Sequence, residues 1–161
     1  MTGAATPAVA VLERSGAVYR VHQYTHDPAV ASFGWEAADA MAVEPGRVFK
    51  TLVASADSAL VVAIVPVTGE LDVKALGAAL GAKRVALADP AAAQKATGYV
   101  VGGISPLGQK RRLPTVVDAT ASRWETVFVS GGRRGLELKL APADLVRLTG
   151  GVLAPIGRAE G

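Results

Sequence analysis

The sequence predicts a mixed α/β (α+β) fold, in which a largely antiparallel mixed sheet is surrounded by short helices. Strand-like runs follow one another without an intervening helix between residues 48 and 65 and between residues 115 and 140, which favours antiparallel pairing. Short helices with capping residues fill the remaining segments. The 161 residues are 50% hydrophobic and contain no repeat or long polar linker. We therefore expect one domain over residues 1–161, with roughly 68 to 70% of its unfolded surface buried.

The chain begins with a helix, a strand and a second helix. Thr6 is a favoured N-cap and a proline follows it, so a helix is predicted over residues 7–16. Alternating side chains over residues 18–24 predict a strand. The alanine-rich residues 35–43 predict a helix that ends before Pro45, because a residue that precedes proline disfavours the helical conformation.

Two β-rich runs, residues 48–54 and 60–65, come next. The turn-forming residues between them, Ser55, Asp57 and Ser58, predict a β-hairpin. The second run is apolar throughout, as in a strand that is buried on both faces, so we expect it at the centre of the sheet.

The second half of the chain alternates helices and strands around one long loop. Two helices each begin after an aspartate N-cap and end at a glycine, over residues 73–81 and 90–98. Residues 99–114 then lose any periodicity and predict a structured loop rich in glycine, proline and basic residues. Three strands and a last helix opened by Pro142 follow, over residues 115–118, 126–130, 136–140 and 142–148.

Composition excludes several kinds of site. The chain contains no cysteine, so disulfide bonds, thiolate metal sites and a protein-borne thiol nucleophile are excluded. The two histidines, His22 and His26, lie roughly 13 Å apart along an extended chain and lack further clustered ligands, so no metal site is expected. No apolar run approaches the roughly 20 residues of a membrane helix, and no basic leader is present, so we expect a cytoplasmic protein with no membrane partner.

Basic residues gather in short runs beside glycine-rich segments. The net charge is +3 and the sequence pI is near 9.4, which permits an anionic partner without requiring one. The runs could follow a nucleic-acid backbone, and they comprise Lys83, Arg84, Lys110, Arg111, Arg112, Arg133 and Arg134. Four aromatic residues offer stacking faces but serve a core equally well: Tyr24, Phe33, Trp35 and Tyr99.

Lys50 interrupts an apolar-rich strand, VFKTLVA. Its ammonium group either points to solvent from the polar face of the strand or provides a fixed cation for a phosphate or for charge that develops on an ester oxygen. Thr51 beside it could supply a hydroxyl group. Because neighbouring strand residues point to opposite faces, both serve one site only if a bulge or bend intervenes.

Two glycine-rich segments could expose backbone N–H groups to a ligand. One contains Gly102 and Gly103, and the other begins with Ser130 and continues as GGRRG. Such groups bind an oxyanion or phosphate, although tight turns have the same composition. Neither segment is a P-loop or a dinucleotide fingerprint, and the chain has no G-x-S-x-G elbow.

Together these motifs resemble the bacterial YbaK/EbsC family of Cys-tRNA(Pro) deacylases, relatives of the editing domain inserted in bacterial prolyl-tRNA synthetases. The resemblance extends along TPAVAVLE, YTHDP, VFKTLV, VAIVPVTGELD, TGYVVGGISPLGQKRRLPT and VSGGRRGLEL, of which the last two are the most specific. It implies a curved, largely antiparallel sheet and trans editing of mischarged tRNA, without metal or cofactor. It further implies that the substrate's own thiol attacks its ester carbonyl, and that a transient complex with prolyl-tRNA synthetase supplies tRNA selection.

The resemblance also assigns site residues. Lys50, Gly102 and Ser130 match catalytic positions, and the substrate-binding positions are Tyr24, Thr51, Gly103 and Glu137. A relative carries aspartate where this chain has Glu137, so the charge is kept but displaced by a methylene group. Candidate contacts to the tRNA backbone are Lys110, Arg111, Arg112, Arg133 and Arg134.

Three other functions remain open at this point. A close alternative is a deacylase for Ala-tRNA(Pro) or another small mischarged residue, since related pockets differ by modest steric changes. A noncatalytic tRNA-binding or synthetase-binding module would keep the fold without turnover. A general nucleic-acid binder would show steep salt dependence and indifference to the attached amino acid.

Overall fold

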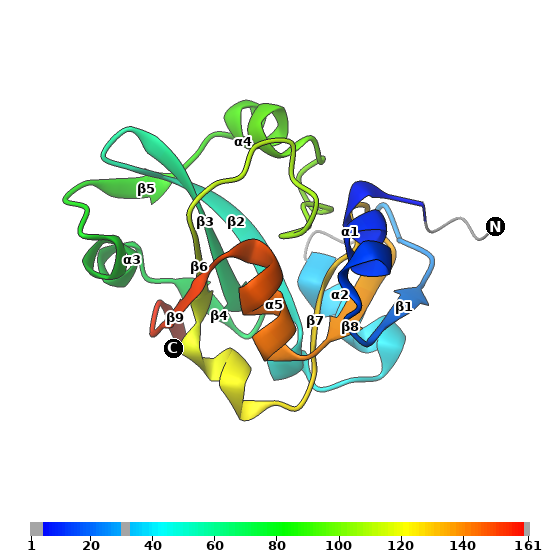
Figure 1. Cartoon of the computed structure of the whole chain (residues 1–161). Helices are drawn as coiled ribbons and strands as arrows, with labels where there is room; N and C mark the ends of the chain where they lie inside the picture. Colours follow the sequence, from blue (N-terminus) through cyan, green and yellow to red (C-terminus); the bar gives the residue numbers. More distant parts are fainter. Residues whose placement is uncertain (1–4, 30–32, 160–161) are drawn as a thin grey trace.

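The computed structural model describes residues 5–29 and 33–159 and confirms the mixed α/β class (Figure 1). Within these residues the helices are short and lie around the sheets. They are α1 (Pro7–Ser15), α2 (Phe33–Met41), α3 (Val73–Leu80), α4 (Pro90–Thr97) and α5 (Pro142–Thr149), with 3-10 helices η1 (Pro45–Arg47) and η2 (Ala119–Arg123). No helix among the described residues is both long and apolar enough to cross a membrane.

A five-stranded sheet forms one half of the molecule. Its strand order is β5-β2-β3-β6-β9, with β2 (Phe49–Ala56), β3 (Ala59–Pro66), β5 (Val85–Leu87), β6 (Thr115–Asp118) and β9 (Val152–Ala154). The predicted hairpin is confirmed as β2–β3, with β3 in the centre and buried. Its turn is shorter than expected, because Ser55 lies within β2 and only Asp57 and Ser58 have positive φ angles.

A second sheet contains β1 (Tyr19–Gln23), β7 (Val127–Ser130) and β8 (Leu136–Leu140) in the order β1-β8-β7, all antiparallel. A bridge between Val48 and Phe128 joins the two sheets. A small ladder pairs β4 (Gly69–Leu71) with β10 (Gly157–Ala159). The expected run of antiparallel neighbours over residues 115–140 is therefore wrong in part: β6 pairs in parallel with β3 and β9, and η2 carries the chain from β6 to the other sheet.

The main hydrophobic core lies between the sheets and is closed by α1, α4 and α5. It combines one face of β2 and β3 with the inner faces of β7 and β8, through residues such as Phe49, Ile64, Val129 and Leu138. The opposite face of β2 and β3 packs on α3 around Leu76. Both faces of the β2–β3 hairpin are thus covered, which makes it the rigid centre of the fold.

Hydrogen bonds at the start of α1 and within the loop after α4 stabilise the two glycine-rich loops. Thr6 caps the helix by accepting a hydrogen bond from the amide of Val9, and its hydroxyl donates to the carbonyl of Gly131. The hydroxyl of Tyr99, a buried residue rather than an exposed stacking face, donates to the carbonyl of Leu107 at 2.6 Å. These bonds fix both loops on the core.

Asp118 anchors the C-terminal strands. Its carboxylate is 3% exposed and accepts hydrogen bonds from the amides of Ile156, Gly157 and Thr120. Burial alone would raise the pKa of Asp118, but these bonds and the Thr120 hydroxyl outweigh it and lower the pKa. Asp118→Ala leaves buried amides without an acceptor, so we expect a loss of about 3 kcal/mol in the free energy of unfolding.

Urea unfolding measures this loss. Asp39→Ala is the matched control because Asp39 is exposed on α2, and we expect it to change stability by no more than about 0.5 kcal/mol. Equal stability of the two variants would show that the carboxylate of Asp118 does not hold the C-terminal strands.

Candidate active site

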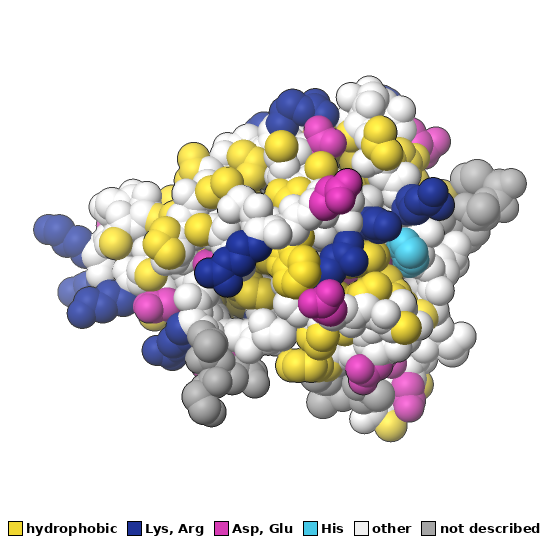
Figure 2. Space-filling model, turned by 90° about the horizontal axis from the view of Figure 1, so that it is seen from below, with side chains coloured by type: hydrophobic (Ala, Val, Ile, Leu, Met, Phe, Trp, Pro, Cys, Tyr) yellow, Lys and Arg dark blue, Asp and Glu magenta, His cyan; other side chains and the backbone are white. Residues whose placement is uncertain are grey.

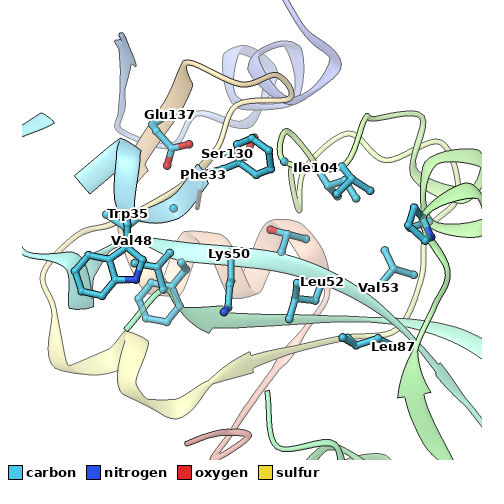
Figure 3. Close-up of a pocket in the computed structure, with 18 of the residues that line it drawn as sticks. Phe33, Trp35, Val48, Lys50, Leu52, Val53, Leu87, Ile104, Ser130 and Glu137 are labelled. Atoms are coloured by element: carbon cyan, nitrogen blue, oxygen red, sulfur yellow. The ribbon is translucent and has the colours of Figure 1, made fainter. Parts of the chain in front are cut away.

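A cavity of about 350 Å³ lies beside β2, between the two sheets (Figure 3). This volume falls in the range of small-molecule sites and accommodates an aminoacyl group but not a nucleic-acid chain. Most of its lining is apolar or aromatic, including Phe33, Trp35, Val67, Leu87 and Ile104. The cavity also contains six of the seven residues expected to be catalytic or substrate-binding, namely Tyr24, Lys50, Thr51, Gly102, Ser130 and Glu137. Gly103 does not line it.

The edge of β2 that faces the cavity is open. β5 pairs only with residues 54–56 of β2, and the amide of Ala88 extends this ladder by one bond to the carbonyl of Val53. In an antiparallel ladder alternate residues direct both backbone groups to the same edge, so Thr51 also directs its N–H and C=O groups away from β3. Beyond Ala88 the chain turns into α4. The main chain of Thr51 therefore offers a donor and an acceptor to a ligand.

This open edge explains how Lys50 and Thr51, whose side chains leave opposite faces of β2, can both line one cavity. The β2–β3 register continues through both residues without a bulge, so their side chains leave opposite faces of the strand. Both nevertheless line the cavity, which wraps around the edge. Figure 3 shows Lys50 leaving β2 on the side away from Glu137 and Ser130. Thr51 lies on the core side, and its buried hydroxyl has no hydrogen-bond partner in the part of the chain that the structure describes.

Glu137 and Ser130 are cross-strand neighbours on β8 and β7, so their side chains share one face of the sheet. The side chain of Glu137 is buried, and burial raises the pKa of its carboxyl group to about 8. Glu137 is therefore mostly protonated at neutral pH. The hydroxyl of Ser130 accepts a hydrogen bond from the amide of Gly132 at 3.2 Å, which fixes the start of the β7–β8 turn.

Tyr24 follows β1 at the border of the cavity. Its pKa is raised to about 12, first by burial and then by the charges of Glu137 and Glu36, so its hydroxyl stays protonated over the neutral range. Tyr24, Phe33 and Trp35, which the sequence offered as stacking faces, all line the cavity.

The loop with Gly102 and Gly103 packs tightly on the β7–β8 turn. Gly102 has φ +90°, and a Cβ atom there would lie 2.7 Å from Nε of Arg134 and from the ring of Phe33. A Cβ atom at Gly103 would lie 2.7 Å from Cα of Arg133. Gly103 therefore serves the contact between the two loops, and Gly102 lets the backbone reach the cavity.

The candidate tRNA-backbone residues divide into two groups. Lys110, Arg111 and Arg112 are exposed after α4, where the amides of the first two donate to carbonyls at the end of that helix. Arg133 and Arg134 lie in the β7–β8 turn, and the guanidinium of Arg134 donates to the carbonyl of Val101. Positive charge is thus present on two loops, of which the first also contributes Val101, Gly102 and Ile104 to the cavity lining.

Among the described residues, neither histidine belongs to a group of three or more side chains that could hold a metal ion. His22 is on β1, where burial and the charges of Lys139 and Arg20 lower its pKa. His26 contacts the Oε1 atom of Glu36 through Nδ1 at 2.7 Å.

A second hollow lies between η1, the segment that follows η2 and β8. Its lining has both charge signs: Glu44, Arg47, Trp124, Glu125, Thr126 and Lys139. Figure 2 shows a face on which basic and acidic side chains alternate around exposed apolar atoms. Mixed charge of this kind does not favour a polyphosphate backbone, so the cavity beside β2 is the better candidate site.

The fold and the cavity are those of a class of proteins that act on aminoacyl-tRNA. Residues 27–148 match the aminoacyl-tRNA editing domain family. The chain belongs to this family, and it is an aminoacyl-tRNA editing deacylase. The resemblance inferred from the sequence motifs is confirmed.

Individual relatives agree with this assignment. EbsC of Enterococcus faecalis, provisionally assigned as a Cys-tRNA(Pro)/Cys-tRNA(Cys) deacylase, is 39% identical over 124 residues, which are 76% of each chain. A proline–tRNA ligase of Moorella thermoacetica is 42% identical over 66 residues, which are 41% of this chain and 12% of the ligase. A crystal structure of a protein provisionally assigned as a trans-editing enzyme for prolyl tRNA synthetase has a TM-score of 0.85 at 26% identity, over 100% of this chain and 99% of that one.

Proposed function

We propose that the chain deacylates mischarged Cys-tRNA(Pro) in trans. The observation that carries this proposal is a cavity of aminoacyl size that wraps around the open edge of β2, with Lys50 on one side and Ser130 with Glu137 on the other. An aminoacyl ester can lie across such an edge. Its terminal nucleotide then contacts the ammonium group of Lys50, and its amino-acid part enters the side that contains Ser130.

The residues on the acyl side position the ester rather than attack it. The backbone at Gly102, the main chain and hydroxyl of Thr51, and the hydroxyl groups of Ser130 and Tyr24 provide hydrogen bonds to the acyl group. In the reaction the cysteine sulfur forms a bond to the ester carbonyl carbon, and the bond from that carbon to the ribose oxygen breaks. The thiol proton passes to the ribose oxygen, which leaves a thiolactone for water to open. Holding the sulfur near the carbonyl supplies much of the rate.

The tRNA outside the cavity is held by the exposed basic loops. Lys110, Arg111, Arg112 and Arg133 are proposed to contact the acceptor backbone, since the cavity cannot admit it. A transient complex with prolyl-tRNA synthetase would select the tRNA. The sequence shared with a proline–tRNA ligase supports this partner.

Deacylation of tRNA(Pro) charged separately with cysteine, serine, alanine and proline tests the function. We expect fast loss of the cysteine ester and slow loss of the serine ester, because serine has a similar size but no thiol. Faster loss of the alanine ester would mean that alanine, and not cysteine, is the amino acid that the protein removes. Binding of tRNA without loss of any ester would identify a noncatalytic module.

A further inference from the structure

Four chain segments meet at one wall of the cavity. They are the loop after β1, the start of α2, the loop around Gly102 and the β7–β8 turn. The residues of these segments that line the cavity include Phe33, Val101 and Gly102. Arg134 does not line it, yet it contacts all three.

Arg134 makes two kinds of contact across this junction. Its Nη2 atom donates a hydrogen bond to the carbonyl of Val101. Its guanidinium carbon lies 4.5 Å from the centroid of the Phe33 ring, in a cation–π arrangement. Because a Cβ atom at Gly102 would approach both Arg134 and Phe33 to 2.7 Å, the three groups are in close contact.

Phe33 has a second ring contact, with His26. The ring of His26 lies 5.5 Å from that of Phe33 at an interplanar angle of 50°. His26 is held by Glu36 at 2.7 Å, and the same carboxylate accepts a hydrogen bond from the amide of Asp27 at 2.7 Å. Phe33 therefore contacts both Arg134 and a histidine that is itself held by Glu36.

We propose that Arg134 is a positioning residue for the editing reaction, whose guanidinium holds Phe33 and the Val101–Gly102 backbone as one wall of the cavity and so determines which acyl group fits. This proposal rests on the proposed deacylase function. It assigns to Arg134 a role different from a contact with the tRNA backbone. Lysine cannot replace arginine here, because an ammonium group lacks the planar surface that stacks on Phe33 while it donates sideways.

The test compares Arg134→Lys and Arg134→Gln with wild type on tRNA(Pro) charged with cysteine or proline, over a series of salt concentrations. Both variants are expected to lower kcat for the cysteine ester and to reduce the cysteine-to-proline ratio of kcat/KM by about tenfold. The slope of log KM against log salt stays that of wild type. Arg111→Gln, at an exposed loop position, is expected to keep kcat and the cysteine-to-proline ratio of wild type. It is expected to reduce the slope of log KM against log salt by about one.

Two further measurements keep the outcome clear. Phe33→Leu leaves every charge in place and is expected to reduce the same ratio, without adding to the effect of Arg134→Lys. Urea unfolding of each variant shows whether it is folded. Wild-type ratios in Arg134→Lys, or a change in KM and salt slope alone in Arg134→Gln, would overturn the positioning role while the deacylase function stands. No turnover by wild type on any ester would overturn both.

Discussion

Lys50→Ala is expected to reduce deacylation of Cys-tRNA(Pro) by about 100-fold to 1,000-fold, because removing one partner of a charged contact that is buried in a complex costs about 3 to 4 kcal/mol. Lys50 is the charged side chain on the outer side of the open β2 edge, where it meets the terminal nucleotide in the proposed binding mode. Arginine keeps the charge but is longer and planar, so Lys50→Arg is expected to recover only part of the activity.

The loss must be separated from unfolding and from a general effect of charge. Lys50 is partly exposed and lies in a strand that keeps its full pairing with β3, so the alanine variant is expected to unfold at the wild-type urea concentration. Lys74→Ala removes one exposed lysine from α3, away from the cavity lining, and should leave deacylation unchanged. Full activity of Lys50→Ala would mean that the terminal nucleotide is held elsewhere.

The helices could be predicted because their signals are local. Thr6, Asp72 and Asp89 were expected as N-caps, and each accepts hydrogen bonds from the first turn of its helix. Capping involves residues within three positions of one another, so no knowledge of the tertiary fold is needed.

The short strands could not be predicted in the same way. β5 and β9 have three residues each, too few for an alternating pattern to appear. The parallel pairing of β6 with β3 depends on which strands the fold brings together. Local sequence therefore identified most strands but not all of their partners.

The site residues also divide into those that a local sequence motif identifies and those that only the fold brings together. Lys50 and Gly102 were expected at the site because VFKT and VVGG match motifs of the deacylase family, whereas the residue pattern alone left a solvent-facing lysine and a tight turn open. The apolar wall, including Val67 and Leu87, carries no such signal, because a cavity lining and a core have the same composition. The joint access of Lys50 and Thr51 to one cavity depends on where β5 stops, which is a property of the sheet.

Glu137 is expected to make the stability of the protein depend on pH. Its pKa is raised by burial from the ordinary value of a glutamate to about 8 in the folded state, so between about pH 4.5 and pH 8 the folded chain binds more protons than the unfolded chain. The contribution of Glu137 to stability therefore falls as pH rises through this interval, by on the order of a few kcal/mol. Below and above the interval this contribution is constant. Glu137→Gln removes the titration, so it should be more stable than wild type at pH 9.

Urea unfolding at pH 5, 7 and 9 compares wild type, Glu137→Gln and Glu13→Gln, the last being an exposed control on α1. The difference between wild type and Glu137→Gln cancels the titrating groups that lie away from residue 137 and should grow with pH, whereas the control should follow wild type. Curves that stay parallel for all three proteins would show that the carboxylate of Glu137 is stabilised in the fold. Glu137 would then be charged at neutral pH, and it would be a counter-ion to the substrate's ammonium group.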